Sequence, residues 1–301
     1  MVYHQFATLY KMQFDVKERD EKLFFGIKFK GKGLAFAKKV VSLCHIYKRK
    51  NSEIMNRKLL LISNSTNRGE AYLDWPKSQI SEFLTRHGVK KVLFVPFAGV
   101  SLSPDGLEAS YNAYEAKVKA VFNALGFELS SIHHEADPVA AVEAAECVAV
   151  GGGNTFHLVK ELHRQKLMDA ISKRAMAGMP YMGWSAGSNV AGPTLCTTND
   201  MPIVEPESFR CMNLVPFQIN PHYTDFFDPK HGGETRDDRL KEYIMVNPNM
   251  YVAGIREATS LLLENGNLSL IGRPNKMKVF KEKIENTKEY DLGEDINFLM
   301  K

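Results

Sequence analysis

Short apolar runs alternate with longer amphipathic segments along the chain from position 59 onward. The short runs are bounded by Gly, Pro or charged residues, a pattern typical of buried strands. In the longer segments apolar side chains recur every three or four positions, as on one face of a helix. We therefore expect strands at Leu59–Ser63, Lys91–Pro96, Phe127–His133, Cys147–Val150 and Pro180–Gly183, and helices at Trp75–His87, Ser110–Leu125, Pro138–Ala145 and Thr155–Ala177.

This alternation of strands and helices predicts an α/β fold with a mostly parallel, doubly wound sheet covered on both faces. After Ser185 the pattern is looser and favours shorter strands of mixed or antiparallel direction. No internal repeat is visible. The later strands are expected around Val204 and at Leu214–Ile219, Met250–Ile255, Ser260–Glu264 and Leu268–Gly272.

The 301 residues, 44% hydrophobic and 25% charged, have the composition of a globular protein with a substantial core. We expect one α/β domain over residues 55–275, a basic and partly disordered N-terminal extension at 1–54, and a charged C-terminal tail at 276–301. The extension holds 12 Lys/Arg and 5 Asp/Glu, so it accounts for the net charge of +4. The main domain is mildly acidic, which argues against nucleic acid as its partner.

No apolar run approaches the ~20 residues that a membrane-spanning helix needs, so a membrane is not an expected partner. The N-terminal segment also lacks the pattern of a secretory signal. The four cysteines, Cys44, Cys147, Cys196 and Cys211, show no metal-ligand spacing. Cys147 and Cys196 lie in apolar or small-residue surroundings and are expected to be buried thiols rather than disulfides. Together these features favour a reducing, cytoplasmic compartment and a protein without a metal.

A Gly-x-Ser-x-Gly motif, Gly183-Trp184-Ser185-Ala186-Gly187, follows the expected strand at Pro180–Gly183. Such a motif is typical of a sharp strand-to-helix turn that exposes a serine hydroxyl near the positive end of the helix dipole. Glycine on both sides leaves room for a turn in which a Cβ would collide. Ser185 is therefore the candidate nucleophile.

A second glycine-rich loop, Gly151-Gly152-Gly153-Asn154, follows the expected strand at Cys147–Val150. Ligands collect at the carboxyl ends of parallel strands, so this loop and Ser185 are expected at the same edge of the sheet. The sequence lacks the lysine of a phosphate-binding loop and an acidic ribose partner. An oxyanion hole formed by the backbone N–H groups of Gly153 and Ala186 is the better prediction.

His222 is the strongest candidate for the general base among the nine histidines. It follows the apolar stretch Leu214–Ile219 and a proline, which together predict a strand end and a rigid turn. Asp200 and Glu257 are both candidates for the carboxylate that orients this histidine. Asp200 lies only a short distance after Ser185, which is unlike the α/β-hydrolase arrangement, and the residues alone leave the two open.

Several motifs, in order along the chain, resemble peptidase E, a family of serine peptidases that also includes cyanophycinase. The resemblance extends from about Met55 to about Gly272 and is highly specific because so many motifs occur in the same order. They are Ser-Asn-Ser-Thr at 63–66, Val-Pro-Phe-Ala-Gly-Val at 95–100, Val-Gly-Gly-Gly-Asn-Thr-Phe at 150–156, Gly-Trp-Ser-Ala-Gly at 183–187, Thr-Thr-Asn-Asp-Met-Pro-Ile-Val at 197–204, Gln-Ile-Asn-Pro-His at 218–222 and Gly-Glu-Thr-Arg at 233–236.

This resemblance implies a fold like that of class I glutamine amidotransferases (flavodoxin-like) and hydrolysis of dipeptides with an N-terminal aspartate. It implies Ser185 as the nucleophile and His222 as the general base. Glu257 becomes the orienting carboxylate, although Asp200 has also been considered for that role. Arg236 matches an arginine proposed to meet the aspartyl side chain of the substrate.

Asn154 matches a residue expected to help hold the free amino group or the oxyanion region. Around Glu257 the chain reads Ile-Arg-Glu-Ala, where bacterial members of the family read Leu-Pro-Glu-Gly.

The expected protein is thus a cytoplasmic serine dipeptidase that acts on a small-molecule substrate without a cofactor, as a monomer or a homodimer. A cyanophycinase-like or β-aspartyl peptidase is the nearest alternative. A non-catalytic binding module on the same fold is an alternative from another class of protein.

Overall fold

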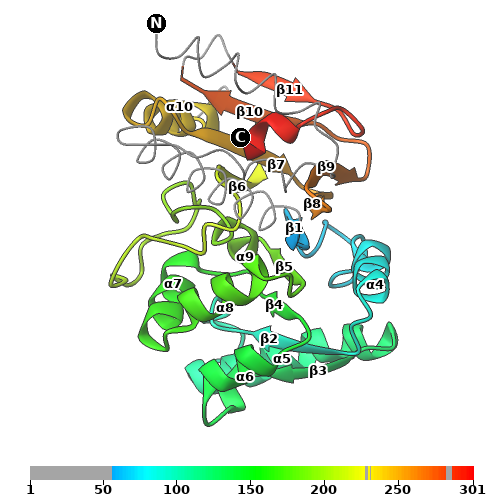
Figure 1. Cartoon of the computed structure of the whole chain (residues 1–301). Coiled ribbons are helices and arrows are strands. Elements are labelled where there is room, and N and C mark those ends of the chain that lie inside the picture. The colour runs from blue at the N-terminus through cyan, green and yellow to red at the C-terminus, as the bar shows by residue number, and fades with distance from the viewer. Residues whose placement is uncertain (1–55, 228–229, 231, 283–286) are drawn as a thin grey trace, which may run out of the picture. The chain divides into compact units, whose positions relative to one another are not determined.

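The computed structural model describes residues 56–301, apart from 228–229, 231 and 283–286 (Figure 1). Every described residue belongs to one compact unit, Ser52–Lys301. The basic extension expected at 1–54 lies outside the described residues.

A seven-stranded sheet forms the larger part of this unit. Its strand order is β3-β2-β4-β5-β1-β8-β9, and the first five of these strands run parallel. The last two pair antiparallel at one edge. The expected mostly parallel α/β sheet is thus confirmed. Its strands are β1 (Leu59–Ile62), β2 (Lys91–Val95), β3 (Glu128–Ser131), β4 (Val148–Val150), β5 (Tyr181–Trp184), β8 (Thr259–Glu264) and β9 (Asn267–Gly272).

Two hydrophobic clusters lie on opposite faces of this sheet because alternate residues of each strand point to opposite faces. Leu60 and Ile62 belong to one cluster, together with residues of α4 (Lys77–Arg86) and α5 (Leu107–Ala124). Leu59 and Leu61 belong to the other, which includes residues of three further helices. These are α6 (Pro138–Ala144), α7 (Thr155–Arg164) and α8 (Leu167–Met176).

The segment expected as one helix over Thr155–Ala177 is two helices, α7 and α8. Lys166 separates them with a φ of 58°, a left-handed conformation that no helix interior accommodates. The strand expected at Phe127–His133 also ends earlier, at Ser131, and a 3-10 turn, η1 (Ile132–His134), follows it. In both places a local backbone turn ends an element earlier than the sequence pattern predicts.

A smaller four-stranded sheet, in the order β11-β10-β7-β6, lies beyond the first (Figure 1). Helix α10 connects the parallel strands β6 and β7 along the chain. Its Leu240 and Ile244 pack in one cluster with Phe280 of β10. The elements are β6 (Gln218–Tyr223), α10 (Arg236–Val246), β7 (Tyr251–Arg256), β10 (Met277–Lys281) and β11 (Lys288–Tyr290).

The C-terminal segment 276–301 is not the charged tail that the sequence predicts. β10 pairs with β7 along its whole length, and the segment ends in η3 (Asn297–Met300), where Leu299 is buried. Met277, Val279 and Phe280 are buried between lysines, so the many charged residues conceal strand periodicity.

Two other expectations also need correction. Val204 lies in a bend rather than a strand, and the strand expected at Leu214–Ile219 begins later, at Gln218. Leu214, Val215 and Phe217 are buried in an irregular segment, which explains why their apolar run resembles a strand. Among the helices of the described residues, none combines the length and the hydropathy needed to cross a bilayer.

Candidate active site

Ser185 occupies the turn between β5 and the short helix α9 (Ala186–Asn189). Its φ of 54° and ψ of −113° are unusual for a residue with a side chain. A Cβ at Gly183 would collide with the carbonyl of Gly187, and one at Gly187 would collide with the carbonyl of Val150. The two glycines of the motif are therefore required by close backbone packing around the serine.

His222 lies between Ser185 and Glu257. Its Nε2 is 2.9 Å from the Ser185 hydroxyl oxygen, and its Nδ1 is 2.9 Å from a carboxylate oxygen of Glu257. The imidazole and the carboxylate are 39% and 55% exposed, so water reaches both. A hydroxyl, an imidazole and a carboxylate in this order form the arrangement that activates a serine nucleophile.

The backbone around His222 is held in an uncommon conformation. His222 is part of β6 rather than the turn after it, with a φ of 52°, and the pairing of β6 with β7 shifts register between Asn220 and Tyr223. The amide of Asn199 donates to the carbonyl of Pro221 at 2.7 Å. A strand with a local bulge re-aims a side chain, which here turns the imidazole toward Ser185.

Two buried polar residues directly after β1, Ser63 and Asn64, support this arrangement. The sequence motifs alone predict no role for them. The Ser63 hydroxyl accepts the N–H of His222 at 2.9 Å and donates to the carbonyl of Ile255 at 2.8 Å. The side-chain oxygen of Asn64 accepts the N–H of Ala258 at 2.8 Å, where the backbone turns with a φ of 63°. Polar residues directly after a fully apolar strand are the sequence signal for such a role.

Asp200 lies away from His222 and contacts the start of α7. One of its carboxylate oxygens accepts the N–H of Thr155 at 2.7 Å, the Thr155 hydroxyl at 2.5 Å and the Thr198 hydroxyl at 3.1 Å. Within the described residues it makes no hydrogen bond with His222. Of the two candidate carboxylates, only Glu257 therefore contacts the imidazole.

The glycine loop after β4 packs against the serine. A Cβ at Gly152 would lie 2.8 Å from the Cβ of Ser185, and a Cβ at Gly153, where φ is 136°, would collide with the carbonyl of Ala98. Within the described residues, no protein group accepts the backbone N–H of Gly153 or of Ala186. These two N–H groups remain available to a ligand beside Ser185.

Asn154 caps the first turn of α7. Its side-chain oxygen accepts the N–H of His157 at 3.0 Å, and its amide nitrogen donates to the carbonyl of Met201 at 2.9 Å. Both ends of the side chain are thus engaged with the protein. The geometry fits a residue that holds the loop rather than one whose amide is free for a substrate.

Arg236 is the first residue of α10, where Thr235 and Asp238 form a capping box. Burial, with a smaller contribution from the positive charge of Arg239, lowers the pKa of its half-buried guanidinium, and Asp200 opposes this effect. In the part of the chain that the structure describes, the guanidinium has neither an ion pair nor a hydrogen-bond partner. A buried, unpaired cation is costly, so an anionic ligand would be favoured here.

A cleft of about 540 Å³ opens over Ser185 and His222. Asp200 lies on one wall, and Tyr114 and Lys117 of α5 lie on another. Arg236 does not line this cleft. The remaining lining residues are Ser65, Tyr72, Ala98, Gly99, Val100, Ser101, Leu102, Gly152, Gly153, Asn154 and Ile203.

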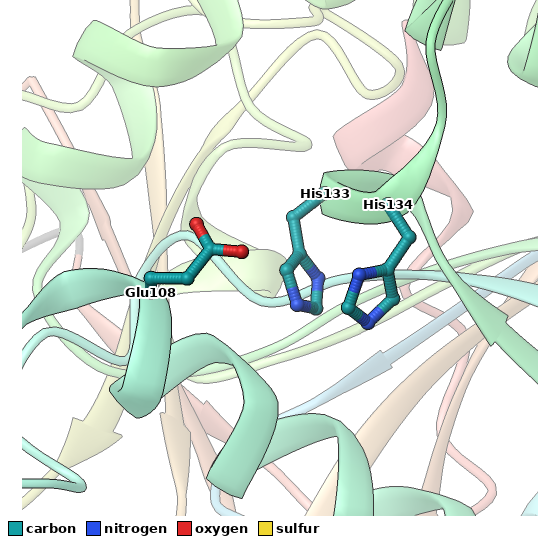
Figure 2. Close-up of side chains that lie close together, drawn as sticks. All are labelled: Glu108, His133 and His134. Atoms are coloured by element: carbon teal, nitrogen blue, oxygen red, sulfur yellow. The ribbon is translucent and has the colours of Figure 1, made fainter.

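A separate polar cluster joins Glu108 of α5 to His133 and His134 of η1 (Figure 2). One potential metal-ligand atom from each lies within 4.8 Å of the others, a grouping that the sequence spacing does not reveal. Three of the ring nitrogens already have partners: His133 contacts Ser131 at 2.6 Å and Asn112 at 3.0 Å, and His134 contacts Glu115 at 2.7 Å. The cluster therefore links α5 to the end of β3, and none of its residues lines the cleft.

The class is that of an α/β protein, in which Ser185, His222 and Glu257 form a series of hydrogen bonds like that of serine hydrolases. Residues 59–271 match the family described as Peptidase family S51. A Peptidase E of Nostoc sp. is 47% identical over 246 residues, covering 82% of this chain and 98% of the relative. A Peptidase E of Escherichia coli is 44% identical over 223 residues, covering 74% and 93%. The chain belongs to peptidase family S51.

Two solved structures share the fold at lower identity. A putative Peptidase E protein from Listeria monocytogenes has a TM-score of 0.50 at 22% identity, covering 72% of this chain and 98% of the other. A peptidase from an acI-B1 actinobacterium has a TM-score of 0.56 at 19% identity, covering 80% and 96%. The resemblance found in the sequence motifs is confirmed, and the chain is a peptidase.

Proposed function

We propose that this chain is a serine dipeptidase that hydrolyses Asp-Xaa dipeptides through an acyl-enzyme. The observation that carries the proposal is the unbroken series of hydrogen bonds from Ser185 through His222 to Glu257. Membership of a peptidase family supplies the reaction type, since a peptide bond is the natural electrophile for such a serine.

Ser185 attacks the carbonyl carbon of the aspartyl residue while Nε2 of His222 takes the hydroxyl proton. Glu257, bonded to Nδ1, stabilises the resulting imidazolium. The imidazolium then protonates the leaving amine, and the second residue departs with a free amino group. A water molecule, deprotonated by His222, attacks the aspartyl ester and restores the Ser185 hydroxyl.

The backbone N–H groups of Gly153 and Ala186 are proposed to stabilise the negative charge that develops on the carbonyl oxygen. Support for this oxyanion hole comes from the position of the two residues, because Ala186 follows Ser185 directly and Gly153 lines the same cleft as Ser185. Within the described residues, neither N–H group has a protein acceptor. Each donor in such a site contributes ~3 kcal/mol of transition-state stabilisation. Asn154 would then keep the glycine loop in place by capping α7.

Arg236 is proposed to bind the β-carboxylate of the N-terminal aspartate. A guanidinium offers two parallel, charge-assisted hydrogen bonds to a carboxylate, which lysine cannot match. Its half-buried position, with no partner among the residues that the structure describes, supports this role. Asparagine in the same place would leave the cation unpaired at a cost of ~2–5 kcal/mol, so strong selectivity for Asp over Asn is expected.

Glu257 is proposed as the third member of the triad. Asp200 instead accepts donors from Thr155 and Thr198, which supports a role in fixing the start of α7 beside the cleft. Because Asp200 also acts electrostatically on Arg236, it would influence substrate binding more than proton transfer.

The decisive experiment compares hydrolysis of Asp-Leu, Asn-Leu, Glu-Leu and β-Asp-Leu by the wild type and by Ser185→Ala. Cleavage of Asp-Leu alone, lost in the variant, is the expected result. Activity retained by Ser185→Ala would exclude the proposed nucleophile. Preferential cleavage of β-Asp-Leu would favour a β-aspartyl or cyanophycinase-like peptidase, and a folded protein inactive on all four would favour a binding role.

We further propose that the enzyme works in the cytoplasm, as a monomer or a homodimer, on a small peptide rather than on nucleic acid. The compartment is supported by the cysteines: Cys147 and Cys211 are buried free thiols, and burial raises the pKa of both. Cys196, which the sequence predicts to be buried, is instead a free thiol on the surface, which a reducing environment would preserve.

A further inference from the structure

Two charged side chains other than the catalytic groups line the cleft over Ser185. Asp200 is one, and its carboxylate is already engaged with Thr155 and Thr198. The other is Lys117, an exposed residue of α5. Within the described residues Lys117 has no ion pair, so the cleft contains one cation whose charge the protein leaves uncompensated.

The neighbouring Lys119 shows the contrast along the same helix. It pairs with Glu115 one helical turn away at 3.5 Å, as surface lysines commonly do. The positions one turn away from Lys117 are Ala113, Tyr114, Ala120 and Val121, which cannot supply a carboxylate. The helix thus carries one paired lysine and one unpaired lysine, and only the unpaired one lines the cleft.

Aromatic residues hold Lys117 beside the site. Its ammonium lies 4.2 Å from the centre of the Tyr72 ring, a cation–π contact. The Tyr72 hydroxyl donates to that of Tyr114 at 3.2 Å, and Tyr114 donates to the carbonyl of Gly152 at 3.0 Å. Gly152 packs directly against Ser185, so a continuous series of contacts connects the lysine with the serine.

The tyrosines themselves do not neutralise this lysine. Burial raises the pKa of both Tyr72 and Tyr114, so both remain neutral phenols at physiological pH. Tyr114 also accepts the indole N–H of Trp184 at 3.0 Å, which fixes its orientation. The ring of Tyr72 therefore positions the ammonium without removing its charge.

A dipeptide differs from the beginning of a longer peptide by a free carboxylate one residue after the scissile bond. One extended residue spans ~3.5 Å, so this carboxylate stays inside the same cleft as the reacting carbonyl. We propose that Lys117 binds the C-terminal carboxylate of the dipeptide and makes the enzyme selective for substrates that end there. Arg236, which lies outside the cleft lining, remains available for the aspartyl side chain. This inference rests on the proposed dipeptidase function.

The test compares Asp-Leu with Asp-Leu-amide, in which the terminal charge is absent but the scissile bond is the same. The kcat/KM of the wild type is expected to be about tenfold higher for the free acid than for the amide, because a charge-assisted hydrogen bond contributes about this much. Lys117→Met should lose about the same factor on Asp-Leu, mainly through KM, and nothing on the amide. Lys117→Arg should retain the preference, and Lys119→Met should behave like wild type.

Equal kcat/KM of wild type for the acid and the amide would overturn this inference and leave the dipeptidase assignment intact. An equal loss of Lys117→Met on both substrates would also overturn it, because a structural role for the lysine would produce that pattern. No hydrolysis of Asp-Leu by the wild type would overturn the proposed function and this inference with it. Salt should weaken the preference of the wild type, since part of the interaction is exposed to solvent.

Discussion

The backbone N–H of His222 donates a hydrogen bond to the side-chain hydroxyl of Ser63 at 2.9 Å, although the two residues are 159 positions apart. The same hydroxyl donates to the carbonyl of Ile255, two residues before Glu257. One fully buried hydroxyl directly after β1 thus fixes both β6, which carries the imidazole, and the end of β7, directly before Glu257.

Ser63→Ala is expected to lower kcat on Asp-Leu by about tenfold or more and to reduce the free energy of unfolding by about 1–3 kcal/mol. The stability loss follows because a buried N–H and a buried carbonyl both lose their shared partner. The loss of kcat follows because the imidazole is no longer held at hydrogen-bond distance from Ser185. Steady-state kinetics and urea unfolding measure the two effects.

Ser172→Ala is the matched control, because its hydroxyl donates to the carbonyl of Met212 at 2.8 Å on α8, away from the cleft. It should lose stability and keep kcat. If both variants lost kcat to the same extent, a general loss of stability would explain the result and Ser63 would have no special relation to His222.

The parts of the fold that rest on local apolar patterns were predictable from the sequence. Strands β1, β2 and β4 are almost entirely buried, so their runs of Leu, Val, Ile, Phe and Ala are nearly continuous. β10 was concealed because lysines alternate with its buried Met277 and Val279. The break between α7 and α8 was concealed because Lys166, and not a glycine, adopts the left-handed conformation.

The candidate site likewise has residues that the sequence could predict and residues that it could not. Ser185, Gly153 and Ala186 lie in compact motifs, so their neighbourhood could be predicted from spacing. The choice between Glu257 and Asp200 could not, because each is close to a plausible element in sequence and only the tertiary arrangement shows which one contacts His222. The support from Ser63 depends on contacts between distant segments, for which a single sequence carries no distance information.

Gly152→Ala is expected to abolish detectable hydrolysis of Asp-Leu. A methyl group there would lie 2.8 Å from the Cβ of Ser185 and 3.0 Å from the carbonyl of Trp184, so the serine or the loop must move. A displacement of even 1 Å at a reacting group can cost about 100-fold in rate. Gly232→Ala adds the same methyl group at a position where no atom of the described residues lies within 4 Å, and it should keep wild-type kcat. Normal turnover by Gly152→Ala would contradict the close approach of the loop to the serine.

Acidification is expected to lower the melting temperature between pH 7 and pH 5, in part through His87 and His133. Burial is the main cause that lowers the pKa of both imidazoles, with His134 adding to the effect at His133. In the unfolded chain these imidazoles bind protons near pH 6.5, whereas in the folded protein they bind them only at a lower pH. The contribution of these two imidazoles to the free energy of unfolding is therefore complete above pH 6.5 and is lost as the pH falls through their pKa in the folded protein.

The variant His87→Gln/His133→Gln tests this origin of the pH dependence. It should show a smaller decrease in melting temperature between pH 7 and pH 5 than the wild type, when each protein is compared with its own value at pH 8. An unchanged slope would assign the acid sensitivity to other groups.

Glu257→Gln and Asp200→Asn separate the two carboxylates near the site. Glu257→Gln keeps the size of the side chain but removes the charge that stabilises the imidazolium and fixes its tautomer, so kcat should fall by about 10²–10⁴-fold with little change in KM. Asp200→Asn replaces the charged oxygen that accepts from Thr155 and Thr198 with a neutral and weaker acceptor, so it should raise KM and lower stability while most of kcat remains. Kinetics on Asp-Leu with both variants measure the difference. The reverse pattern, with kcat lost in Asp200→Asn and retained in Glu257→Gln, would mean that Asp200 moves to His222 when substrate binds and that the 2.9 Å contact of Glu257 is not the catalytic one.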